Sequence, residues 1–329
     1  MTECVTVKTV LKRGALVAAA NWQVTAIQFV ADTTFKMLLS VPLVGGVMLV
    51  VLVLGRELPE VFTSDLRGSM TFVATALWAE PVALASFLLA FSLVGLAGSA
   101  LLFLLKGGTV AVLARGERDA DPVEDPPLRL KPFWTAARFS IERFEAGCRD
   151  YMRRYLRLGL SLIVLYVLSG GAYLGLLWSS YASMGDRQLS WTAVAGMGSL
   201  LLAGWITLVN FFYLLVQMIV VVDNCSVHAA GRRVFAFLRG EPRLSFGVFG
   251  VVLLLVAGAT LVSLIATTSL GVIAFVPLAG LAVIPLQLLA WLFRGLVFQY
   301  LELSALGAYL ALYRRHSSPA AATDPGPGA

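Results

Sequence analysis

Residues 244–293 read LSFGVFGVVLLLVAGATLVSLIATTSLGVIAFVPLAGLAVIPLQLLAWLF and contain no Lys, Arg, Asp or Glu. A helix rises about 1.5 Å per residue, so a single helix of this length would extend for about 75 Å. The hydrocarbon layer of a bilayer is only about 30 Å thick. The stretch therefore predicts two membrane-spanning segments that are joined by a reversal of the chain.

Four other windows lack charged residues, namely 37–55, 82–105, 158–185 and 189–222. A helix needs about 20 apolar residues to cross a bilayer, so these windows are suitable as further spans. The whole chain is 59% hydrophobic and 13% charged, with a mean hydropathy of +0.84, whereas a soluble domain has about 25% charged residues. These values exclude a soluble globular protein. We predict an all-α fold, a polytopic integral membrane helix bundle with about six transmembrane helices.

We expect a single membrane domain over residues 1–315 and a disordered tail over residues 316–329, which is rich in Pro and small residues. Residues 1–30 lack the cleavage pattern of a signal peptide, so the first span is expected to act as the insertion signal. The predicted spans are about 36–54, 82–105, 158–180, 194–222, 246–269 and 286–313.

The end of the chain allows two arrangements. In the first, a re-entrant or interfacial segment over residues 271–285, which contains Pro277 and Pro285, precedes span six. In the second, span six covers residues 272–293, and residues 295–313 lie along the membrane surface. We favour the first arrangement, because this final stretch is apolar on all sides and a surface helix should have a polar face.

The number of basic residues alternates between successive loops. Residues 56–80 hold two arginines and four acids, whereas residues 106–157 hold eleven Lys or Arg. Because cytoplasmic loops are enriched in Lys and Arg, we expect the second loop and both termini to face the cytoplasm of a bacterial inner membrane. Cys4, Cys148 and Cys225 all fall in segments assigned to the cytoplasm, where no disulfide is expected.

An amphipathic cytoplasmic or interfacial helix is predicted over residues 133–157, directly before span three. Apolar residues recur there at steps of three or four, which is typical of one helical face. This helix is either an element that docks lipid headgroups or a partner, or a packed collar that anchors the bundle. We favour the collar, because amphipathic entry helices are common at bilayer interfaces. The arginines that are candidates for headgroup contact are Arg138, Arg149, Arg153 and Arg154.

Glu302 falls inside predicted span six, where an ionised carboxylate costs about 2.5–3.5 kcal/mol or more. It therefore needs a partner or a proton. Arg294 lies two turns earlier on the same helix, and Asn210 and Gln217 lie on span four. We predict that these four residues form an intramembrane polar site. It is either a proton or substrate site or a buried polar clamp, and we favour the clamp because the spans hold no second acid for a proton relay.

The segment after span four reads IVVVDNCSVHAAGRRVFAFLRGEPRLSFGVF from residue 219 to residue 249. A hydrophobic end with an acid at 220–223 is followed by Ala229 and Ala230, by residues 237–240, which end in Gly, and by an apolar run from Phe246. This order resembles the membrane domain associated with glycerophosphoryl diester phosphodiesterases and related uncharacterised six-span bacterial proteins.

The chain also ends its apolar part with AYLALYRRH, residues 308–316, which is similar to the close of the last span in that family. The resemblance implies a six-span fold and a membrane setting. It does not imply hydrolysis, because the sequence contains no phosphodiesterase catalytic domain. The metal-binding carboxylates and histidines of that domain have no counterparts here, and the histidines present are His228 and His316.

No catalytic, cofactor-binding or metal-binding motif is apparent, so we predict no enzyme activity, no cofactor and no metal site. Cys225 and His228 are three residues apart but are too few for a metal site. No nucleic-acid partner is predicted, because the formal charge of +6 follows from the basic cytoplasmic loops. The predicted partners are membrane lipids, and the cytoplasmic segments offer a surface for a protein partner.

We therefore predict a non-enzymatic membrane protein that organises lipid or other envelope components. The alternative is a transporter or permease subunit with a polar site at Glu302. A membrane-embedded enzyme that acts on lipids ranks last.

Overall fold

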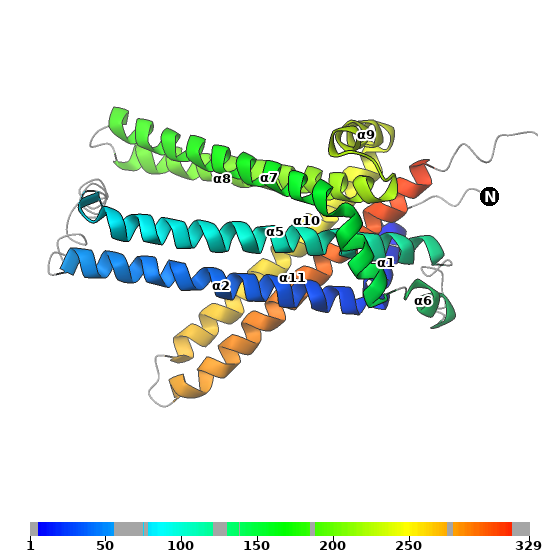
Figure 1. Ribbon diagram of the computed structural model, residues 1–329, viewed down its shortest axis with the longest axis horizontal. Helices are drawn as coiled ribbons and strands as arrows, with labels where there is room; N and C mark the ends of the chain where they lie inside the picture. The colour runs from blue at the N-terminus through cyan, green and yellow to red at the C-terminus, as the bar shows by residue number, and fades with distance from the viewer. Residues whose placement is uncertain are drawn as a thin grey trace, which may run out of the picture. The chain divides into compact units, whose positions relative to one another are not determined.

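The computed structural model describes residues 6–55, 75, 78–120, 130–137, 139–184, 188–274 and 279–317. Over these residues the secondary structure is helical (Figure 1). In chain order the helices are α1 (Val7–Ala20), α2 (Trp22–Leu54), α5 (Pro81–Asp119), α6 (Leu130–Ala136), α7 (Ile141–Met184), α8 (Gln188–Val222), α9 (Val227–Gly240), α10 (Pro242–Ala274) and α11 (Ala279–Ser317).

Six of the described helices, α2, α5, α7, α8, α10 and α11, are long and apolar enough to cross a membrane. Each contains one predicted span, and the prediction of an all-α polytopic helix bundle is confirmed. Large apolar side chains on these helices are widely exposed, for example Leu200 at 76% and Leu254 at 72%. Water disfavours apolar exposure on this scale, whereas lipid does not. The chain is therefore a multi-pass membrane protein.

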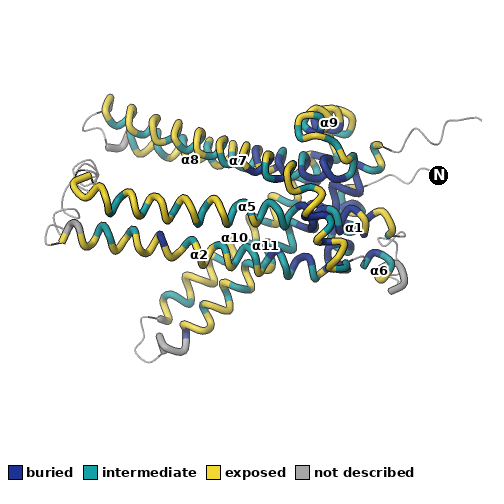
Figure 2. The backbone as a smooth tube through the Cα atoms, viewed as in Figure 1, coloured by how far each residue is buried: buried dark blue, intermediate teal, exposed yellow. Residues whose placement is uncertain are grey.

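Buried side chains gather at one end of the spanning helices, around α1 (Figure 2). We call this part the core end, and we call the exposed apolar parts of the same helices the apolar belt. Tyr155, Leu215, Phe237 and Tyr309 are among the largest side chains that the core end buries completely or almost so. Besides α1, the core end comprises residues 107–117 of α5, 144–159 of α7, 209–221 of α8, α9 and 303–313 of α11.

Helix length explains why the core end exists. α7, α8 and α11 contain 44, 35 and 39 residues, which corresponds to about 66, 52 and 58 Å. All three exceed the roughly 30 Å of hydrocarbon, so a large part of each helix extends beyond it. The extended parts pack on one another, and this packing keeps them helical past the predicted spans.

The chain divides into two compact units. One contains residues 30–102, and the other contains the first 29 residues together with everything from Phe103 onward. In the smaller unit, glycines on the two helices make room for aromatic rings. A Cβ atom at Gly46 would lie 2.4 Å from the Phe87 ring, and one at Gly98 would lie 2.1 Å from the Phe35 ring.

Helix α1 lies outside every predicted span and forms a central part of the core end. Thr6 begins it with a capping box, in which the Thr6 side chain accepts a hydrogen bond from the Thr9 backbone N–H. Its buried face contains Val10, Gly14 and Val17. This face packs against α11, which follows it by almost 300 residues.

The interfacial helix predicted over residues 133–157 differs from the observed structure. α6 ends at Ala136, and α7 begins at Ile141 and continues without a break into span three. Ser140 caps the start of α7, because its side chain accepts a hydrogen bond of 3.3 Å from the Arg143 backbone N–H. The apolar face of this part of α7 packs into the core end through Phe144, Cys148 and Tyr155, in the manner of a collar.

The re-entrant segment predicted over residues 271–285 also differs. Its described parts continue the two adjacent helices, because α10 extends to Ala274 and α11 already begins at Ala279. Pro277 lies outside the described residues. Pro285 is inside α11, where neighbouring helices and local adjustments make a proline tolerable in a membrane helix. The prolines were therefore misleading as signs of a separate element.

Candidate functional site

Glu302 forms an ion pair with Lys106. The Lys106 ammonium donates a hydrogen bond of 2.8 Å to Glu302 Oε1, which joins α5 to α11. The side chains remain 25% and 40% exposed, respectively. The same ammonium lies 5.7 Å from the centroid of the Tyr213 ring on α8. A carboxylate in apolar surroundings thus obtains a cationic partner, as its solvation cost requires.

This partner differs from the ones expected from the sequence. The Arg294 guanidinium lies over the Phe298 ring, 5.6 Å from its centroid, in the apolar belt. Asn210 Oδ1 accepts a hydrogen bond from the Tyr166 hydroxyl. Gln217 is buried, and its backbone carbonyl accepts a hydrogen bond of 3.0 Å from the Tyr155 hydroxyl. The structure therefore does not join the four predicted residues into one hydrogen-bonded cluster.

Glu302 and Asn210 do line one cavity. It has a volume of 370 Å³ and lies between α8, α10 and α11. Its polar lining consists of Thr207, Asn210, Gln299, Glu302 and the ring-bearing Tyr309, and its apolar lining consists of Phe211, Leu214, Phe249, Val252, Leu253, Val256, Phe298 and Ala305. We call it the belt cavity. Its mixed lining is suited to an amphipathic molecule.

The belt cavity lies where the apolar belt meets the core end. On α11, exposed large apolar side chains end at Leu296 and continuous burial begins at Leu303. On α8, the corresponding positions are Leu208 and Val209. Glu302 is thus near the edge of the apolar belt, about where lipid hydrocarbon gives way to headgroups.

The arginines proposed for headgroup contact have different surroundings. Arg149 and Arg153 are exposed on α7. Arg154 donates a hydrogen bond of 2.6 Å to Asn224 Oδ1, which holds the turn between α8 and α9. Asn224 has a φ of +46° there, a left-handed conformation that Asn tolerates better than most residues. Arg138 lies outside the described residues.

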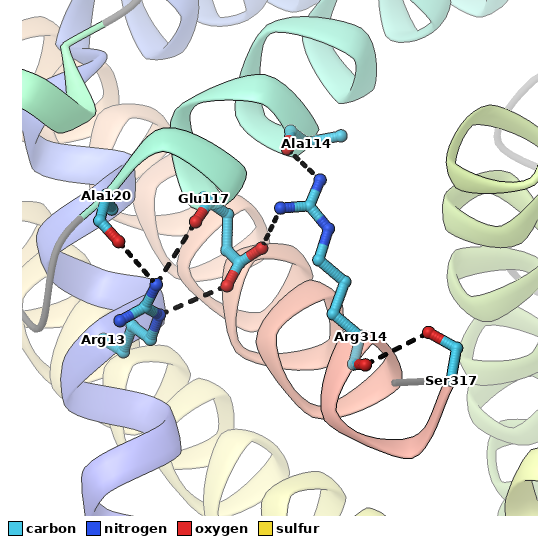
Figure 3. Close-up of polar contacts among 6 residues, drawn as sticks. All are labelled: Arg13, Ala114, Glu117, Ala120, Arg314 and Ser317. Carbon is cyan, nitrogen blue, oxygen red and sulfur yellow. Dashed lines mark hydrogen bonds and ion pairs between the residues drawn. The ribbon is translucent and has the colours of Figure 1, made fainter. Parts of the chain in front are cut away.

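A buried ion cluster at the core end was not predicted from the sequence. Glu117, near the end of α5, lies between Arg13 of α1 and Arg314 of α11 (Figure 3). Arg13 Nε donates a hydrogen bond of 3.2 Å to Glu117 Oε1, and an Arg314 amino group donates to Oε2. The Glu117 side chain is only 6% exposed. The three residues come from three helices and tie both ends of the described chain to α5.

The two arginines also bind the backbone of α5. Arg13 donates to the Glu117 and Ala120 carbonyls at 3.2 and 3.1 Å, and Arg314 donates to the Ala114 carbonyl. Carbonyl groups at the end of a helix have no donor within the helix. The arginines therefore also cap α5, which the sequence did not reveal because the partners are over 100 and almost 200 residues away.

Among the described residues, no group of three His, Cys, Asp or Glu side chains is close enough to hold a metal ion. The fold and the belt cavity define the class of this chain as a polytopic helical membrane protein. Comparisons with models of protein families, with curated proteins and with solved structures gave no match.

Proposed function

We propose that the protein binds a membrane lipid in the belt cavity and thereby organises lipid or envelope components without catalysing a reaction. The observation that carries this proposal is the composition of the cavity. Its polar residues Asn210 and Glu302 lie at the edge of the apolar belt, and its remaining lining is mostly apolar. A lipid has the same division between a polar headgroup and apolar chains.

The Lys106–Glu302 pair supports a role for a neutral or zwitterionic headgroup. The ammonium already offsets the Glu302 charge, so the cavity presents hydrogen-bonding groups without a large excess of either sign. Glu302 still has 40% of its side-chain surface exposed, and it therefore borders the cavity while it binds Lys106.

The test fills the cavity. Leu253→Trp is expected to remove most of the lipid that the purified protein retains, because the indole would occupy the space beside Phe249 and Val256. Retained lipid is measured by native mass spectrometry after mild detergent washing. Leu254→Trp is the matched control, because Leu254 is 72% exposed and does not line the cavity. Equal lipid retention by the two variants would refute the proposed site.

Transport is the second candidate function, and the Lys106–Glu302 pair favours it because charged groups within membrane helices often mark transport pathways. The same variants separate the two functions. A lipid site predicts a change in retained lipid with Leu253→Trp. A transporter predicts instead that Glu302→Gln abolishes solute uptake in a folded protein that retains its lipid.

The proposed orientation places the core end in the cytoplasm of a bacterial inner membrane, since the Lys- and Arg-rich segments lie there. Ser190 and Ser226 are both exposed and flank opposite ends of α8. In a chain without native cysteines, a membrane-impermeant maleimide applied to intact cells is expected to label Ser190→Cys and not Ser226→Cys. Permeabilised cells should show labelling of both. The reverse pattern in intact cells would invert the topology.

The native cysteines are removed for this experiment because they report poorly. Cys148 is buried. Burial also raises the pKa of the Cys225 thiol, so the reactive thiolate is scarce at neutral pH. Labelling of the native Cys225 should therefore be slow and should increase as the pH rises.

A further inference from the structure

A second pocket lies at the core end, between α5, α7 and α8, and has a volume of 280 Å³. Small residues leave the space open, because Ala111 and Ala114 on α5 face Ala146 and Gly147 on α7. Three arginines, Arg115, Arg118 and Arg143, complete the lining together with Asp150, Tyr151 and residues at the end of α8. We call this site the arginine pocket.

The arginine pocket is electropositive. Arg115 and Arg118 are three residues apart on α5 and so project from one side of that helix. Arg143 comes from the first turn of α7. These three positive charges face the single negative charge of Asp150 within the lining. The nearby Arg314 adds to the positive field, since Arg118 and Arg314 are close enough to repel each other.

The helices that carry these arginines are held together closely. A Cβ atom at Gly108 would lie 2.6 Å from the Phe144 carbonyl oxygen, so α5 and α7 pack nearly backbone against backbone. The Tyr151 hydroxyl donates a hydrogen bond of 3.4 Å to the Val221 carbonyl and ties α7 to α8. A rigid frame reduces the entropy lost when the pocket binds a ligand.

The arginine pocket is far from the apolar belt. Along α7, Leu160 is the first exposed leucine of the belt. Tyr151 and Arg143 precede it by 9 and 17 residues, so they lie about 13 and 25 Å away along the helix axis. A headgroup layer adds only about 5–8 Å on each side of the hydrocarbon. The position therefore favours a ligand from the aqueous phase.

We propose that the arginine pocket binds the phosphate group of a small phosphate-bearing ligand. Guanidinium groups match phosphate oxygens in geometry and charge, and several arginines that converge on one hollow are typical of phosphate recognition. The volume lies just below the range of about 300–1,000 Å³ found for drug-sized ligands, so it suits a compact anion. This site is separate from the belt cavity and does not depend on lipid binding there.

The test uses the full chain in nanodiscs of neutral phosphatidylcholine, titrated with pyrophosphate by calorimetry. Arg115→Gln combined with Arg118→Gln is expected to weaken binding about tenfold or more, because charge-assisted hydrogen bonds are lost. Arg149→Gln combined with Arg153→Gln removes the same charge from exposed positions outside the pocket. This control pair should change binding by less than about twofold.

A second arm separates the two sources of phosphate. Liposomes that contain phosphatidylglycerol replace pyrophosphate, and thermal stabilisation of the protein is measured. Loss of this stabilisation in the pocket variant alone, without pyrophosphate binding by the wild type, would support a phosphate site that serves lipid headgroups. No response in either arm, or equal losses in the pocket and control variants, would overturn the proposal. Arg115→Lys combined with Arg118→Lys keeps the charge and should retain part of the binding, which distinguishes lost recognition from lost folding.

Discussion

Glu117→Ala is expected to lower the free energy of unfolding by about 3–5 kcal/mol, because it leaves two buried arginines without their carboxylate. The side chains of Glu117, Arg13 and Arg314 are only 6%, 12% and 17% exposed, so solvent screens the unbalanced charges poorly. Thermal unfolding in detergent, followed by size-exclusion chromatography of the remaining folded protein, should show a midpoint about 5–10 °C lower.

The Glu117 cluster stabilises more than an ion pair. Arg13 and Arg314 also donate hydrogen bonds to carbonyls at the end of α5, and Glu117 holds both guanidinium groups in position for this. Glu117→Gln keeps the shape and one acceptor oxygen but loses the negative charge. Its effect should therefore lie between those of the wild type and Glu117→Ala.

The control for this prediction is Glu145→Ala on α7. Glu145 is exposed, and a surface substitution of this kind usually changes stability by no more than about 0.5 kcal/mol. If Glu117→Ala and Glu145→Ala unfold at the same temperature, the buried cluster does not contribute as its burial indicates.

The apolar belt was predictable from sequence because lipid imposes a local rule. Each helix that crosses hydrocarbon must be apolar over about 20 residues, whatever its neighbours are, so windows such as 82–105 and 189–222 identify spans directly. The core end follows no such rule. Residues 107–117 of α5 mix Gly, Ala, Arg and Glu, and they are helical because α1, α7 and α11 pack around them.

The candidate sites show the same division. The cost of a carboxylate in a span identified Glu302 as a residue that needs a partner, but the partner Lys106 is 196 residues away and only the tertiary structure reveals it. A local signal for α1 was present and was not used. Thr6 and Thr9 provide a capping box, and Val10, Gly14 and Val17 recur at helical spacing.

Gly14→Ala is expected to destabilise the protein by about 3 kcal/mol, near the upper end for an overpacked site. A Cβ atom at Gly14 would lie 2.3 Å from the Ala308 backbone nitrogen and 2.4 Å from the Ser304 carbonyl oxygen. These are backbone atoms of α11, so no side chain can rotate away and the helices themselves must separate. Thermal unfolding in detergent should show a lower midpoint, and protease should cleave α1 more readily.

Gly231→Ala makes the same chemical change on α9, where a Cβ atom would meet nothing within 4 Å. It should leave stability unchanged or raise it by about 0.5–1 kcal/mol, because Ala is the better helix former. Opposite shifts for the two variants would locate the effect in the α1–α11 contact, whereas equal shifts would contradict it. Since Arg13 precedes Gly14, separation of the helices also weakens the Glu117 cluster, and the combined variant Gly14→Ala/Glu117→Ala should lose less than the sum of the single losses.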